Sequence, residues 1–158
     1  MELRRGRSVV RFCVTLGGYL LLWQLAAWPT LYRFVERSDL IVIGHISGVS
    51  CRQGVLPAGF PKVDAKNTAE VRGVIAVSRT LKGDLGKERH LRYRWICGSC
   101  AVSKCGELGN WMNDLTDGIW YLRRRPGGEV TSPEIMGDPG FRDMSYLAET
   151  YDMMKAVK

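Results

Sequence analysis

The segment Arg37–Ser50 constrains the fold more than any other stretch of this chain. It reads RSDLIVIGHISGVS, so the aliphatic block Leu40–Ile43 is followed closely by Gly44 and Gly48. Aliphatic and β-branched residues favour strands, whereas a glycine inside a strand marks a bend or the close approach of another backbone. The segment therefore predicts a buried strand that bends, as the first strand of a small barrel does, rather than a strand of a flat sheet.

Two later segments alternate with the period of two that is typical of a strand with one buried face. In Ala69–Leu81 the odd positions are mostly apolar, and Glu70 and Arg72 stand among the even positions. In Arg89–Ile96 one face is apolar and the other basic: the apolar residues are Leu91, Tyr93 and Trp95, and the basic residues are His90, Arg92 and Arg94. The apolar face is expected to meet a core, and the basic face water or a ligand.

The remaining segments complete an all-β domain that ends in a helix. The stretch 51–66 is rich in glycine, proline and charge and predicts an exposed loop. A cysteine-containing connection at 97–118, with one short helix, leads to a strand at 119–124 and, after Pro-Gly-Gly, to another at 129–135. In Asp143–Val157 the apolar residues recur at helical spacing, which predicts an amphipathic closing helix packed on the barrel; they are Met144, Leu147, Ala148, Tyr151 and Met154.

The N-terminal region has the features of a membrane-targeting segment. Four arginines, at positions 4, 5, 7 and 11, precede the uncharged run Phe12–Leu31, which is long enough to span a bilayer as a helix. The basic flank predicts a cytoplasmic N-terminus, with the rest of the chain exported. We expect residues 1–37 to be a single-pass anchor and 38–158 the folded domain outside the cytoplasm. A cleaved signal, which would release a secreted domain, and a soluble buried helix are the alternatives.

The charge distribution argues against a nucleic-acid partner. The formal net charge of the chain is +7, of which +4 lies in residues 1–37 and +3 in the rest. A folded domain with so small an excess falls short of the dense basic surface that nucleic-acid binding domains carry. We therefore expect the membrane to be one partner, through the N-terminal helix, and expect no nucleic acid.

Three short stretches carry a resemblance to a known family. They are Ser38–Gly44 (SDLIVIG), Thr80–Asp84 (TLKGD) and Gly118–Leu122 (GIWYL), in that order. In these stretches the chain resembles the exported bacterial domains related to netrin-like and tissue-inhibitor-of-metalloproteinase barrels. The resemblance implies a five-stranded OB-like Greek-key barrel, here with a C-terminal amphipathic helix, in an extracytoplasmic setting.

The inhibitory activity of that family is not implied. Its inhibitors chelate the protease zinc through a cysteine at the mature N-terminus, and no residue here matches that position. Cys13 lies inside the apolar run, and Cys51 follows the predicted first strand. The resemblance therefore implies a fold and a compartment only.

The cysteines are the most distinctive local feature. Cys97, Cys100 and Cys105 lie within nine residues, and Cys51 is a possible fourth member of the set. Outside the cytoplasm four cysteines favour two disulfide bridges, with three possible connectivities. A zinc site with Cys51 or a histidine as fourth ligand, a redox-active pair and free thiols are the alternatives. The sequence has no second CxxC, which argues against zinc, and no βαβ pattern around this one, which argues against a redox pair.

The sequence contains no catalytic constellation, so we expect a protein that is not an enzyme and has no cofactor or bound metal. Candidate binding residues are those of the basic face together with two neighbours from the next strand: His90, Arg92, Arg94, Tyr121 and Arg123, with Arg124 and Arg125 adjoining. The expected function is membrane-anchored, non-catalytic binding of a protein or an anionic envelope polymer. The alternative is a zinc-binding or thiol-redox envelope protein that uses the cysteine loop, and a merely solvated face is the third possibility.

Overall fold

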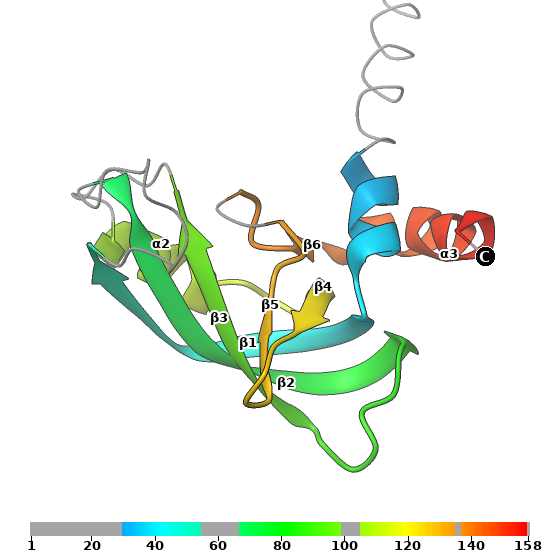
Figure 1. Cartoon of the computed structure of the whole chain (residues 1–158), viewed down its shortest axis with the longest axis horizontal. Coiled ribbons are helices and arrows are strands. Elements are labelled where there is room, and N and C mark those ends of the chain that lie inside the picture. The colour runs from blue at the N-terminus through cyan, green and yellow to red at the C-terminus, as the bar shows by residue number, and fades with distance from the viewer. Residues whose placement is uncertain (1–29, 55–66, 99–104, 135–136, 158) are drawn as a thin grey trace, which may run out of the picture. The chain divides into compact units, whose positions relative to one another are not determined.

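Five strands of this chain close into a mixed β-barrel in the computed structural model (Figure 1). They are β1 (Leu40–Gln53), β2 (Ala69–Lys82), β3 (His90–Cys97), β4 (Gly118–Arg124) and β5 (Glu129–Thr131). Around the barrel the order is β1, β2, β3, β5, β4 and back to β1; β3 and β5 run parallel, and the other neighbours run antiparallel. The predicted five-stranded barrel with a C-terminal helix is confirmed.

The structure describes residues 30–54, 67–98, 105–134 and 137–157. The chain divides into two compact units, Met1–Arg33 and Phe34–Lys158, and the barrel belongs to the second. The predicted membrane segment, residues 12–31, lies almost entirely outside the described residues. Among the helices within the described ranges, none is both long enough and apolar enough to cross a bilayer.

Strand β1 bends so that it can pair on both sides. Its first five residues pair with β4, while Ile41 to Gln53 pair with β2, with register shifts after Ile41, Ile43 and Ser47. Gly44 makes the close approach possible, because a Cβ there would lie 2.4 Å from the carbonyl oxygen of Ala76. The strand continues to Gln53. The prediction of a loop from Cys51 is therefore wrong for its first three residues, which pair with β2 instead.

The barrel interior is filled by alternate residues of all five strands. Trp120 lies at its centre: its indole Nε1 donates to the carbonyl oxygen of Gly44 at 3.0 Å, and its ring packs 5.4 Å from Tyr93 and 5.0 Å from Phe141. The other large residues of this core are Leu40, Val42, Ile46, Val71, Ile75, Leu91, Trp95, Met112 and Leu122. Large aromatic rings that interlock in this way leave the barrel packed rather than hollow.

A short helix at residues 30–37 leads into the barrel domain, and its C-terminal carbonyls are capped. The backbone N–H of Ser38 donates to the carbonyl oxygen of Phe34 at 3.1 Å, and the Ser38 hydroxyl donates to the same oxygen at 2.5 Å. The ammonium group of Lys82 donates to the carbonyl oxygen of Val35 at 2.8 Å. A cation at a helix C-terminus also interacts favourably with the helix dipole, so Lys82 fixes this helix to the end of β2.

The helices and the last strands differ in detail from the prediction. The predicted short helix in the cysteine-containing connection is α2 (Cys105–Asn113), and the predicted strand at 129–135 ends at Thr131, two residues before Pro133. A two-residue strand, β6 (Phe141–Arg142), pairs with β4 and was not predicted. Phe141 of this strand packs against Trp120. This contact holds the short strand on the barrel, and it could not be predicted from the sequence of the strand alone.

The closing helix is α3 (Leu147–Ala156), preceded by the 3-10 turn η3 (Met144–Tyr146). Its fully buried residues are Thr150 and Met153. The predicted apolar stripe is therefore only partly right, because Met144 is exposed, and Tyr151 and Met154 are half-buried. The buried face of α3 is therefore centred on Thr150 and Met153 rather than on the predicted apolar stripe.

Candidate arginine site on the outer face of the barrel

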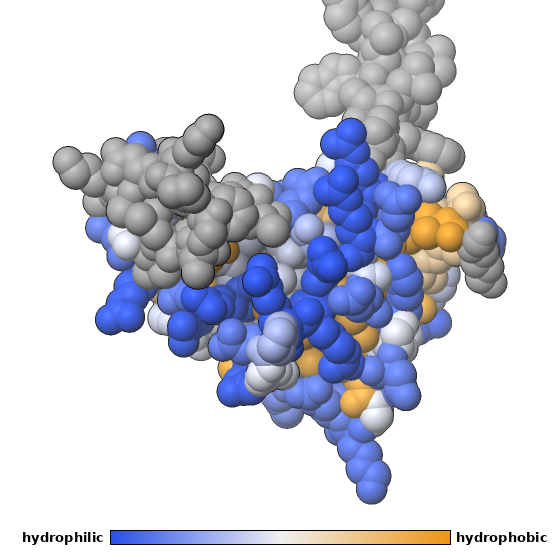
Figure 2. Space-filling model, in the orientation of Figure 1, coloured by the Kyte–Doolittle hydropathy of each residue, from blue (hydrophilic) through white to orange (hydrophobic). Residues whose placement is uncertain are grey.

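The two faces of β3 are divided as the alternation predicted. Leu91, Tyr93 and Trp95 are buried in the barrel, whereas His90 and Arg92 are exposed and Arg94 is half-buried. Figure 2 shows hydrophilic side chains covering the visible face, over β3 and β5, while hydrophobic surface gathers where α3 lies. The outer face of β3 is therefore polar, but the partners of each cation decide whether it can bind a ligand.

Arg94 is held by a carboxylate that the sequence placed among the exposed polar positions. Glu70 is only 3% exposed, and its carboxylate accepts hydrogen bonds from the guanidinium groups of Arg72 and Arg94. Burial alone would raise the pKa of Glu70, but the hydrogen bonds and positive charges of the two arginines outweigh it and lower the pKa below the ordinary value. Glu129 lies 4.0 Å from Arg94 as well. Arg94 thus belongs to an intramolecular ion cluster.

Arg92 is also engaged within the barrel. Its guanidinium group donates to the carbonyl oxygen of Gly127 at 2.6 Å, in the turn between β4 and β5. Because Gly127 and Gly128 both have positive φ, this turn adopts a conformation that glycine favours, and Arg92 ties it to β3. Of the predicted basic row on β3, Arg92 and Arg94 therefore have structural partners, and His90 is exposed.

Tyr121 does not lie at an exposed face, and the prediction that it lines a binding surface is wrong. It is fully buried, its ring packs 5.5 Å from that of Phe34, and its hydroxyl lies 2.6 Å from Thr150 Oγ1. Burial raises its pKa to about 12, so the hydroxyl stays protonated at neutral pH. The alternation along β4 does point Tyr121 away from the barrel interior, but α3 and Phe34 cover it there.

A pocket on the outer face, next to the turn between β4 and β5, gathers three consecutive arginines. We call it the arginine pocket; it is lined by Arg123, Arg124, Arg125, Thr131, Ser132 and Pro133 and has a volume of about 220 Å³. Strand pairing forms it, because Arg123 lies opposite Thr131 in the β4–β5 pair. Small-molecule pockets usually measure about 300–1,000 Å³, so this one suits a single small group rather than a whole ligand.

The three arginines of the pocket differ in their freedom to bind. Arg124 is fixed at the end of the barrel, because its guanidinium group donates to the carbonyl oxygen of Asp84 and its backbone N–H donates to Asp39 at 3.1 Å. The side chains of Arg123 and Arg125 are exposed and have no hydrogen bond or ion pair to any described residue. Two guanidinium groups are therefore free to bind an anion.

The hydroxyl group of the pocket is already oriented. Ser132 Oγ donates to the carbonyl oxygen of Asp138 at 2.6 Å and accepts from the backbone N–H of Glu134 at 3.2 Å. Pro133 comes directly after it and ends the strand. These two hydrogen bonds hold the Ser132 hydroxyl in place among the residues that line the arginine pocket.

The cysteine loop forms disulfides. Cys51, near the end of β1, is bonded to Cys105, the first residue of α2, and Cys97 is disulfide-bonded too. Cys100 lies outside the described residues. A sulfur in a disulfide is not a thiolate and cannot ligate zinc, and the described part of the chain holds no group of three or more metal-ligating side chains.

Comparison with known proteins adds no relative: no family model, curated protein or solved structure matches this chain. The candidate site therefore stands on its own geometry. Of the predicted binding residues, His90 is exposed, Arg92 and Arg94 are bonded within the barrel, Tyr121 is buried, and Arg123 lines a pocket. The signal for the pocket was present in the sequence as three arginines directly before a Pro-Gly-Gly turn.

Proposed function

We propose that this chain is a non-catalytic binding domain of the OB type, held at a membrane by its N-terminal segment, that binds an anionic envelope polymer outside the cytoplasm. The order of the strands around the barrel, the parallel β3–β5 pair and a helix between β3 and β4 support the OB assignment. Barrels of that type bind ligands with the face of strands 2 and 3 and the loops between strands 1 and 2 and between strands 4 and 5.

The observation that carries the binding proposal is the pair Arg123 and Arg125, beside the turn between β4 and β5, whose side chains are exposed and have no hydrogen bond or ion pair to any described residue. Guanidinium groups present planar donors that match the oxygens of phosphate, sulfate and carboxylate. A pocket of about 220 Å³ accommodates one such group at a time. In a polymer the anionic group is repeated, so each of many units can bind in this pocket. We therefore favour a polymer over a small anion as the ligand.

The compartment is inferred from two features. The basic flank of the uncharged run predicts export of the residues C-terminal to that run, and structural disulfides such as Cys51–Cys105 persist mainly in oxidising compartments. Fusion of an export-dependent reporter after Lys158 should give an active reporter. A reporter active only in the cytoplasm would contradict the proposed location without bearing on the arginine pocket.

Binding is tested on the fragment Thr30–Lys158, which retains the helix before the barrel, including the buried Phe34. The probes are inorganic polyphosphate and a sulfated polysaccharide at low and high ionic strength. Binding should weaken with salt, because the contacts are between exposed charges. An Arg123→Glu, Arg125→Glu variant should bind about tenfold more weakly, the scale of two exposed charge pairs.

The control must change the net charge by the same amount elsewhere. Arg79→Glu with Lys87→Glu serves this purpose, since both side chains are exposed and neither has a hydrogen bond or ion pair to a described residue. This control should bind like the parent. Equal losses in both variants would mean that binding follows net charge alone, which would refute a site at the arginine pocket, and binding of an acidic protein but of neither polymer would refute the proposed ligand.

A further inference from the structure

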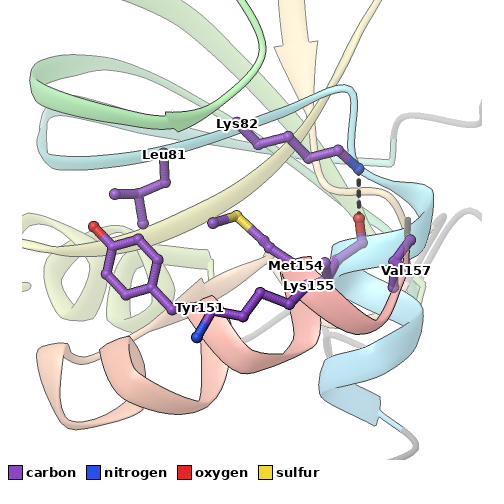
Figure 3. Close-up of a pocket in the computed structure, with 7 residues that line it drawn as sticks. Leu81, Lys82, Tyr151, Met154, Lys155 and Val157 are labelled. Atoms are coloured by element: carbon purple, nitrogen blue, oxygen red, sulfur yellow. Dashed lines mark hydrogen bonds between the residues drawn. The ribbon is translucent and has the colours of Figure 1, made fainter.

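A second pocket lies between α3 and the end of β2. It has a volume of about 390 Å³ and is lined by Val35, Leu81, Lys82, Tyr151, Met154, Lys155 and Val157 (Figure 3). Its volume lies at the lower end of the range of small-molecule pockets, about 300–1,000 Å³. Unlike the arginine pocket, it can enclose part of an organic ligand.

The walls of this pocket are apolar because α3 leaves part of its apolar side chains outside the core. The buried residues of α3 are Thr150 and Met153, and the adjacent apolar residues Tyr151 and Met154 are left half-buried. They face Leu81 of β2 across the pocket (Figure 3). The apolar stripe of α3 is thus used to line a pocket rather than to fill the core.

The rim of the pocket is positively charged. Lys82 uses one N–H to cap the carbonyl oxygen of Val35 at 2.8 Å, and its ammonium group has two further donors. Lys155 pairs with Asp152 at 3.2 Å, but both side chains are mostly exposed, so water screens this pair. Among the described residues that line the pocket, none is acidic.

We propose that this pocket binds a free fatty acid, with the acyl chain between α3 and β2 and the carboxylate at Lys155, whose ammonium group lies beside Tyr151 (Figure 3). Apolar walls with an ammonium group at the edge are complementary to a ligand that is apolar along its length and anionic at one end. The volume suits one acyl chain rather than the two of a phospholipid. The site is separate from the arginine pocket and does not depend on the function proposed for it.

Photochemical labelling of the full chain tests this proposal. A photoactivatable long-chain fatty acid is added to a detergent-free lysate that contains the full chain, and the labelled peptides are mapped by mass spectrometry after irradiation. Labels should fall on the peptides that contain Leu81 and Tyr151–Val157. The corresponding long-chain alcohol, which lacks the charge, should label these peptides about fivefold less, the scale of one exposed charge pair.

Two variants and a matched control sharpen the result. Met154→Trp, which fills the pocket, should reduce labelling about tenfold, and Lys155→Glu about fivefold. Lys87→Glu, an equal change of charge at an exposed residue of the β2–β3 turn, should be labelled like the parent. Circular dichroism in the near ultraviolet checks that each variant is folded.

The proposal is overturned if the labels fall on other peptides, or if Met154→Trp and Lys155→Glu are labelled like the parent. It is also overturned if the alcohol labels these peptides to the same extent as the acid does. The positively charged rim would then not contribute to binding of the carboxylate. Capture of the acyl chain from an anionic phospholipid, with no capture of the free acid, would equally overturn it.

Discussion

The hydroxyl of Tyr121 lies 2.6 Å from Oγ1 of Thr150, and this contact joins β4 to α3 in a buried setting. Thr150 Oγ1 also lies 2.7 Å from the carbonyl oxygen of Tyr146, which can only accept. The single proton of Thr150 therefore goes to Tyr146, and the proton between the two hydroxyls comes from Tyr121. The relay runs in one direction, from Tyr121 through Thr150 to Tyr146.

This direction predicts unequal effects of two conservative substitutions. Tyr121→Phe removes one hydrogen bond and should lower the free energy of unfolding by about 1 kcal/mol, whereas Thr150→Val leaves the buried Tyr121 donor without an acceptor and should cost about 1–3 kcal/mol. The double variant should be less unstable than the sum of the two losses, because no donor is left unsatisfied. Urea unfolding of the four proteins measures this cycle, and additive losses would contradict the relay.

Tyr121 should also make the domain sensitive to alkali. Its folded-state pKa of about 12 lies above the ordinary value of 10, so the unfolded chain releases this proton more readily than the folded one. The associated stability is complete below pH 10 and is lost as the pH rises from 10 towards 12. The stability difference between the parent and Tyr121→Phe, measured by urea unfolding, should therefore shrink over this range. A constant difference would mean that Tyr121 titrates normally.

The opposite dependence is expected for Glu70, whose folded-state pKa is lowered from its ordinary value of 4.5. Its stabilisation is present above pH 4.5 and is lost as the pH falls through the lower folded-state pKa. Glu70→Gln should cost about 1.5–3 kcal/mol at neutral pH, the scale of a hydrogen bond to a charged group. The deficit should diminish in acid, as measured by urea unfolding at several pH values. An equal deficit at all pH values would contradict the ionic role of Glu70.

The disulfide between Cys51 and Cys105 should contribute strongly to stability. The two cysteines are separated by 54 residues, and closure of a loop of that size corresponds to about 4 kcal/mol in the chain-entropy model. Replacing both by serine should lower the free energy of unfolding by about 2–5 kcal/mol, with the loss visible as a lower Tm. A variant as stable as the parent would mean that this disulfide does not contribute to the stability of the barrel.

Close packing at Gly44 should make a small substitution costly. In Gly44→Ala the new Cβ would lie 2.4 Å from the carbonyl oxygen of Ala76, so the β1–β2 pair must separate and stability should fall by about 1–3 kcal/mol. Gly109→Ala is the matched control, since no described atom lies near its Cβ position and alanine is more stable than glycine in the middle of a helix by about 0.5–1 kcal/mol. Thermal unfolding should show a decrease in Tm for the first variant and a small increase for the second.

The sequence predicted the strand faces well because alternation reports burial directly. In β3 Leu91, Tyr93 and Trp95 lie inside and each basic residue lies outside, and no other element needs to be known to deduce this. The same reasoning missed Glu70, which stands at a polar position but is covered by Arg72 and Arg94. Its burial depends on the pairing of Arg72 with Arg94 across β2 and β3, and one strand alone does not reveal this register.

The candidate site was harder to predict, because exposure is decided by distant segments. Tyr121 points outwards as its position in β4 requires, yet Phe34 and Thr150, far from it in the sequence, bury it. The predicted boundary at residue 38 separates Phe34 from the domain that needs it, since the second compact unit begins at Phe34. Arg123 to Arg125 formed the one part of the predicted site whose neighbours, a turn and a short strand, were adjacent in the chain.

The pairing of β1 with β4, which closes the barrel, also affects the order in which the parts of the domain fold. Leu40 pairs with Leu122, so the first strand to emerge finds its second neighbour only after most of the domain has been synthesised. Contacts between residues so distant in the chain slow folding. Until β4 arrives, Leu40–Ile43 is an apolar strand with an open edge, the kind of surface on which nascent chains aggregate. Closure of the barrel is therefore expected to be a late step of folding, since the edge of Leu40–Ile43 stays open until Leu40 can pair with Leu122.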